Sequence, residues 1–195
     1  MKKLFVFAAL AALALTSCSG DIELGKDDEK VNPLVLNELD GQSKFIELYN
    51  NTSAAIDLAG YTLVKYDSTK EGGKSTTWTA AAGMTIASKG FVVLESSDLA
   101  DPEEKGDPNY EYESENHVFK GGLSPKKNVK IELVNPEGEV VDTFIRGEEG
   151  AGWNQTKLNE NEECSFSRVP NGSGDFAYAA PTKGAENGEK VAAID

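Results

Sequence analysis

After residue 33 the chain is a series of short apolar runs separated by turn-forming residues, and this pattern most constrains its fold. The clearest run, VKIELV at 129–134, alternates apolar and polar residues, which is typical of a strand with one buried face. The NPEG segment after it favours a turn, and a second run returns at 140–145. Comparable runs occur at 34–39, 44–50, 60–66, 91–95 and 165–169. No stretch in this part keeps a 3.6-residue period, so we predict an all-β antiparallel sandwich or barrel.

The N-terminal 17 residues have the organisation of a secretory signal. Lys2 and Lys3 precede about a dozen apolar residues, a run shorter than the roughly 20 that a membrane-spanning helix needs. The segment Leu-Thr-Ser-Cys ending at Cys18 resembles the bacterial lipobox. That resemblance implies cleavage before Cys18, a diacylglycerol thioether on its sulfur and an acylated amine, and several acyl chains anchor a protein stably to a membrane. An ordinary secretory signal with an incidental cysteine is the alternative.

Residues 18–32 are polar and acidic without periodicity, which predicts a lipidated tether between the membrane and the domain. Their acidic patch resembles the export signal that sends some lipoproteins of the Bacteroidota to the outer face. We therefore expect a lipid-anchored protein of the cell envelope, in the outer membrane and displayed at the surface.

The charge balance argues against a nucleic-acid partner. The chain has 33 acidic and 19 basic residues and a net charge of −14, which becomes −16 when Lys2 and Lys3 are removed. Affinity for nucleic acid depends on lysine and arginine contacts to phosphates.

If lipid occupies the sulfur of Cys18, Cys164 has no disulfide partner, because the chain has two cysteines. We predict that Cys164 is a buried, inert thiol.

The segment 96–116 interrupts the strand pattern with a concentration of carboxylates. Its acidic residues are Asp98, Asp101, Glu103, Glu104, Asp107, Glu111, Glu113 and Glu115, against the single base Lys105. Between two strands this predicts a long surface loop. Carboxylates are ligands for Ca²⁺, but the spacing matches no EF-hand loop. Both a calcium site and a solvated acidic loop stay open, and no other cofactor is expected.

Five motifs in series resemble the lamin tail domain family. They are Asn37-Glu38-Leu39 with FIELYN at 45–50, IDLAGYTL at 56–63, GFVVL at 90–94, LVNPEGEVVD at 133–142, and SRVPNG at 167–172 with PTKGAEN at 181–187. The resemblance covers roughly 33–188 and implies an immunoglobulin-like β-sandwich. The remaining tail at 189–195 is expected to be flexible. In nuclear lamins such domains bind proteins and DNA, and none of the motif positions implies catalysis.

Several polar residues within these motifs have predicted structural roles. Glu47 and Arg168 are charges in otherwise apolar strands, which suggests a partly buried ion pair; two independent exposed charges are the alternative. Asn37, Asp57 and Asn187 are expected to satisfy backbone groups at turns.

Three classes of function are compatible with the sequence to different degrees. The leading hypothesis is a non-enzymatic envelope module that holds a protein partner. A glycan-binding surface is the alternative, and Trp78, Trp153, Tyr110 and Tyr112 are its candidate stacking residues. An enzyme is disfavoured, because His117 is the only histidine and has neither a zinc-ligand partner nor a nucleophile elbow beside it.

Overall fold

The structure is a computed structural model that describes residues 32–66, 73–100, 115–125, 129–146, 161 and 163–194. The predicted signal peptide 1–17, the predicted lipidation site Cys18, nearly all of the predicted tether and residues 101–114 of the acidic segment lie outside these ranges. In the part that is described, no helix has the length and apolar character needed to cross a membrane.

Thirteen strands and two short 3-10 helices make up the described part of the chain. The strands are β1 (Leu34–Asp40), β2 (Phe45–Asn50), β3 (Ile56–Asp57), β4 (Thr62–Tyr66), β5 (Lys74–Thr79), β6 (Thr85–Ile86), β7 (Phe91–Ser96), β8 (Val118–Phe119), β9 (Val129–Val134), β10 (Val140–Arg146), β11 (Ser165–Val169), β12 (Asp175–Ala179) and β13 (Lys190–Ala193). The helices η1 (Ser97–Ala100) and η2 (Glu115–His117) occupy the two ends of the acidic segment. The prediction of an all-β chain is confirmed.

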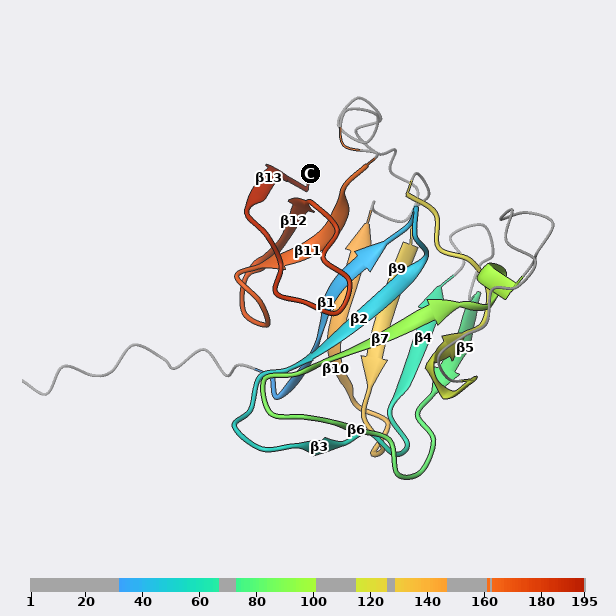
Figure 1. The fold of residues 1–195 in the computed structure, drawn as a ribbon. Coiled ribbons are helices and arrows are strands. Elements are labelled where there is room, and N and C mark those ends of the chain that lie inside the picture. Colours follow the sequence, from blue (N-terminus) through green and yellow to red (C-terminus); the bar gives the residue numbers. More distant parts are fainter. Residues whose placement is uncertain are drawn as a thin grey trace, which may run out of the picture. The chain divides into compact units, whose positions relative to one another are not determined.

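The strands form two main sheets that face each other (Figure 1). One has seven strands in the order β13-β12-β11-β1-β2-β7-β8, and the other has four in the order β10-β9-β4-β5. The pair β7–β8 is parallel, and every other pair in these two sheets is antiparallel. A small ribbon of β3 and β6 lies beside them. The arrangement is the predicted immunoglobulin-like antiparallel sandwich.

The core lies between the two sheets and follows from the alternation read in the sequence. Every second residue of a strand points to the same face, so apolar residues at that spacing meet across the sandwich. The buried side chains that line it include Leu36, Leu48, Leu63, Leu94, Ile131, Leu133, Phe144 and Phe166. Phe144 of the smaller sheet packs on Phe166 of the larger one, with ring centroids 5.5 Å apart.

Hydrogen bonds also connect the sheets along both sides. On one side the Lys120 N–H donates to the Thr77 carbonyl over 2.7 Å, and the Trp78 indole donates to the Asn116 carbonyl over 2.7 Å. On the other side, side chains of β10 and β11 reach the backbone of β1 at Leu36. Both edges of the smaller sheet are therefore tied to the larger one.

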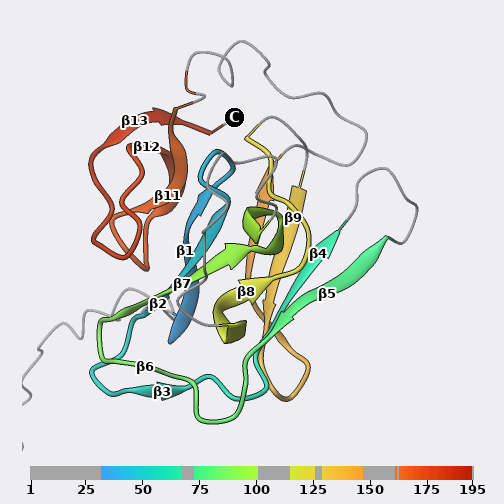
Figure 2. The ribbon, with the colours of Figure 1, turned by 45° about the vertical axis from the view of Figure 1, so that its right-hand side comes forward.

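The C-terminal residues correct one prediction. Residues 189–195 were expected to be flexible, but Lys190–Ala193 form β13 and pair antiparallel with β12, as Figure 2 shows. This strand is hard to recognise in the sequence, because the glycines and glutamates of the preceding segment interrupt the apolar pattern just before it begins.

Candidate functional site

A β-bulge in β1 directs the side chain of Asn37 into a buried network of polar groups. The register between β1 and β2 shifts between Leu36 and Glu38, so Asn37 is the extra residue. Its side chain is fully buried, donates to Glu47 Oε1 over 2.9 Å and accepts from the Gly172 N–H over 3.0 Å. The bulge thus connects β1, β2 and the turn between β11 and β12.

Residues 180–189, which we call the strap, join β12 to β13 and cross the outer face of the larger sheet in front of β1 and β2 (Figure 1). The Thr182 N–H and hydroxyl donate to the carboxylate of Glu38 over 3.0 Å and 2.9 Å. The Gly184 N–H donates to Glu47 Oε2 over 2.7 Å. Lys183 forms an ion pair with Glu95 of β7. Carboxylates of β1, β2 and β7 therefore hold the strap in place.

The strap also closes onto β1 and β11 through Asn187. The amide of Asn187 donates to the carbonyls of Asn37 and Arg168, and its N–H donates to Asn171. Asp57 accepts from the Ala59 N–H over 2.9 Å. The predicted roles of Asn37, Asp57 and Asn187 in satisfying backbone groups are confirmed.

Glu38 and Glu47 lie directly opposite each other in the β1–β2 register, and each is 0 % exposed. Burial raises the pKa of Glu47 to about 7, and the negative charge of Glu38 contributes to the same rise. Burial likewise raises the pKa of Glu38. Two carboxylates at one buried site disfavour each other's ionisation.

The predicted Glu47–Arg168 ion pair is wrong. Arg168 instead pairs with Asp142 of β10, with Nη2 and Oδ1 2.7 Å apart, and its guanidinium lies over the ring of Phe176. Glu47 receives neutral amide donors from Asn37 and Gly184. The two charges lie in the same sheet, but their side chains take part in separate networks.

The prediction missed Asp142, which is the actual ion-pair partner of Arg168. It stands at the end of the motif LVNPEGEVVD at 133–142, and a carboxylate at that motif position was the available signal. A second register shift, between Val140 and Asp142, places its side chain toward β1.

The outer face of the four-stranded sheet is defined by three cross-strand rows: Ile145-Lys130-Tyr66-Lys74, Thr143-Glu132-Val64-Thr76 and Val140-Val134-Thr62-Thr79. Ile145 and Val140 are 55 % and 51 % exposed. Tyr66 donates to Glu132 over 2.6 Å, and the Lys130 ammonium pairs with Glu132 while lying 4.5 Å from the Tyr66 ring centroid. The first and third rows of this face present exposed apolar side chains and lysines, whereas Val64 and the ion-paired Glu132 in the middle row are 3 % and 6 % exposed.

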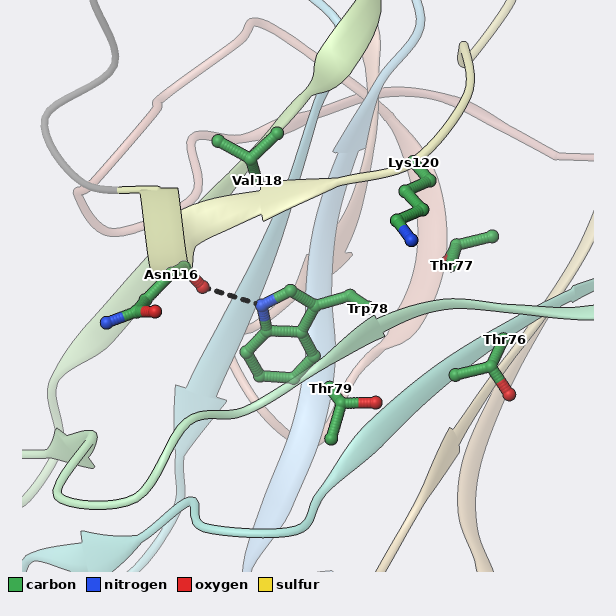
Figure 3. A pocket seen from close by; sticks show the side chains of 7 residues that line it. All are labelled: Thr76, Thr77, Trp78, Thr79, Asn116, Val118 and Lys120. Carbon is green, nitrogen blue, oxygen red and sulfur yellow. Dashed lines mark hydrogen bonds between the residues drawn. The ribbon is translucent and has the colours of Figure 1, made fainter.

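A recess of about 330 Å³ lies between β5 and the segment 116–120 around β8. It is lined by Thr76, Thr77, Trp78, Thr79, Asn116, Val118 and Lys120 (Figure 3). Trp78 is 4 % exposed, and its indole N–H is occupied by Asn116. It is a core residue and offers no face on which a sugar ring could stack. The other three candidate stacking residues, Trp153, Tyr110 and Tyr112, lie outside the described residues.

The remaining chemically reactive residues have structural surroundings. Cys164 is partly buried and packs against the core, and burial together with the charge of Glu163 raises the pKa of its thiol. A raised thiol pKa leaves less of the nucleophilic thiolate. Within the described ranges, no three His, Cys, Asp or Glu side chains are placed to hold a metal ion. Most of the acidic segment considered for Ca²⁺ lies outside those ranges.

Comparison with known proteins identifies the family. The family model described as Lamin Tail Domain matches residues 28–147, which include β1 to β10. No curated protein matches the chain. The fold fits the family, whose members have an immunoglobulin-like, non-catalytic sandwich, and the strands after residue 147 complete its larger sheet. The chain therefore belongs to the lamin tail domain family.

Proposed function

We propose that this protein is a non-enzymatic interaction module of the cell envelope, anchored by lipid at Cys18, that holds a protein partner on the outer face of its four-stranded sheet. The observation that most supports this proposal is the difference between the two outer faces of the sandwich. The strap covers the outer face of β1 and β2 in the larger sheet, whereas the smaller sheet presents Ile145 and Val140 half-exposed.

The chemistry of that face indicates the kind of partner. Exposed apolar side chains lose unfavourable hydration when a partner covers them. Lys74 and Lys130 are cations on an otherwise strongly acidic chain, so a partner surface with apolar and acidic residues complements the face. Tyr66, held by its hydrogen bond to Glu132, adds a rigid aromatic of the kind enriched at interfaces. The glycan alternative has less support, because Trp78 is buried.

The partner site is tested by site-specific photo-crosslinking in the native cell. A photoreactive residue at position 145 should give a discrete protein adduct, and Val140→Asp should abolish it. The same photoreactive residue at position 191 is the matched control, because Val191 is 62 % exposed but lies on β13 of the other sheet. Identical adducts from both positions, or none from position 145, would remove this face as the binding site.

The anchor is tested separately. Metabolic labelling with a palmitate analogue should mark the wild-type chain and leave Cys18→Ala unlabelled and released from the membrane fraction. Equal labelling of the two chains would exclude Cys18 as the lipid site without affecting the crosslinking result.

A further inference from the structure

Two carboxylates that lie side by side at a site inaccessible to water bind the strap to the sheet. Glu38 holds Thr182 and Glu47 holds Gly184, and both glutamate side chains are 0 % exposed. In the β1–β2 register they stand directly opposite each other. Like charges in directly opposed cross-strand positions repel, and the repulsion is stronger where water is excluded.

Among the described residues, the charged groups around this pair do not neutralise it. On the strap, Lys183 pairs with Glu95 of β7, and on β11 the guanidinium of Arg168 pairs with Asp142. On β1, Asp40 acts as a further negative charge on Glu38. The donors that reach Glu47 are the neutral amides of Asn37 and Gly184. A second negative charge at this site is therefore left without a counterion.

We propose that the strap is a proton-dependent clasp: it stays closed while Glu38 and Glu47 together carry at most one negative charge, and it opens more often when both are ionised. Opening lets water reach the carboxylates and separates Thr182 and Gly184 from them. It also uncovers the outer face of the larger sheet, where Phe45 is 1 % exposed with the Lys183 ammonium 6.0 Å from its ring centroid.

The direction of the pH dependence follows from proton linkage. In the closed strap, burial raises the pKa of Glu47 to about 7, whereas a carboxylate that water reaches keeps its ordinary value of 4.5. The closed strap therefore binds a proton that the open strap releases. Raising the pH between these two values therefore favours opening, by about tenfold per pH unit. Above the upper value both states are ionised and the dependence levels off.

Amide hydrogen exchange in the full chain, held in detergent, tests the clasp. The amides of Thr182 and Gly184 should lose about tenfold in protection per pH unit between about pH 5 and pH 7, after correction for intrinsic exchange, with little further loss above. Glu47→Gln removes the group whose pKa lies near 7 and should abolish most of this dependence, leaving only the part that the raised pKa of Glu38 contributes. Equal protection of the wild-type strap across this range would overturn the proposal.

Glu139→Gln is the control, because Glu139 lies in the turn between β9 and β10 of the smaller sheet, where it hydrogen-bonds to Asn135. This variant should keep the wild-type pH dependence, and loss of the dependence here would also overturn the clasp. If Glu47→Gln fails to fold, the carboxyl ¹³C resonance of Glu47 in the wild type decides. A titration midpoint near 7 supports the clasp, and a midpoint near 4.5 contradicts it.

Discussion

Asp142 of β10 and Arg168 of β11 form an ion pair between the two sheets and together hydrogen-bond both backbone groups of Leu36. Asp142 Oδ2 accepts from the Leu36 N–H over 2.8 Å, and Arg168 Nε donates to the Leu36 carbonyl over 2.8 Å. β1 pairs with β11 at Glu38 and Leu39. The ion pair thus takes the place of a neighbouring strand at Leu36.

Arg168→Met should destabilise the domain by about 3 kcal/mol, because it leaves the Asp142 carboxylate, whose side chain is 9 % exposed, without its counterion. Urea denaturation followed by circular dichroism measures the change. Lys44→Met is the control, because Lys44 and Asp98 form a longer ion pair of 3.7 Å at the surface, and its loss should cost under about 1 kcal/mol. Equal costs for the two variants would contradict a special role for the inter-sheet pair.

The contribution of Glu47 to the free energy of unfolding should fall as the pH rises from about 5 to about 7. Folding raises the pKa of Glu47 to about 7 from 4.5, so the folded chain binds more protons in this range and loses stability as they leave. For this fully buried group the loss is on the order of 2–3 kcal/mol. The quantity to measure is the difference between wild type and Glu47→Gln at each pH, since other carboxylates titrate in both. A difference that stays constant from pH 5 to pH 7 would refute the expectation.

Tyr66 should ionise well above an ordinary tyrosine. Its hydrogen bond to Glu132 raises the pKa of the phenol to about 12, with smaller contributions from burial and from the Glu132 charge. Glu132→Gln should return the pKa toward 10, as measured by the ultraviolet absorbance of the phenolate or by the ¹³C resonance of the ring. An unchanged Tyr66 titration in Glu132→Gln would exclude this hydrogen bond as the cause.

Two motif glycines with similar backbone angles should respond differently to alanine. Gly138 has φ +85° with nothing within 4 Å of an added Cβ, so Gly138→Ala should cost about 1–2 kcal/mol for the left-handed conformation alone. Gly172 has φ +71°, and an added Cβ would lie 2.0 Å from Asn51 Oδ1 and 2.6 Å from Tyr49 Cδ1. Gly172→Ala should therefore cost clearly more. Thermal unfolding of the two variants gives the comparison, and equal losses would mean that the Asn51 side chain moves aside freely.

The strands and the family could be read from the sequence because strand alternation and turn residues are local properties. The partners of buried charges could not, since they depend on register, and register here is altered by bulges at Asn37 and between Val140 and Asp142. An ion pair between Glu47 and Arg168 was a reasonable expectation for two charges in apolar strands. Its failure comes from the strap, whose backbone satisfies Glu47 without any cation.

The candidate site was harder to predict than the fold. Outward rows such as Ile145-Lys130-Tyr66-Lys74 exist only once four strands are in register, and no single strand reveals them. Trp78 was a candidate from the sequence that the fold removes. Tryptophan is a typical binding residue, but here its indole is buried and hydrogen-bonded to Asn116, a residue distant in the sequence.

The family match ends at residue 147, but β11, β12 and β13 complete the larger sheet. A recombinant fragment cut at that boundary would leave the edge of β1 with unpaired backbone donors and acceptors, together with the buried carboxylates of Glu38 and Glu47 stripped of their donors from the strap. Such an edge recruits strands from other molecules. The segment that matches the family, residues 28–147, is therefore shorter than the segment that folds as a unit, which extends through β13. Expression of the shorter segment alone should yield aggregates.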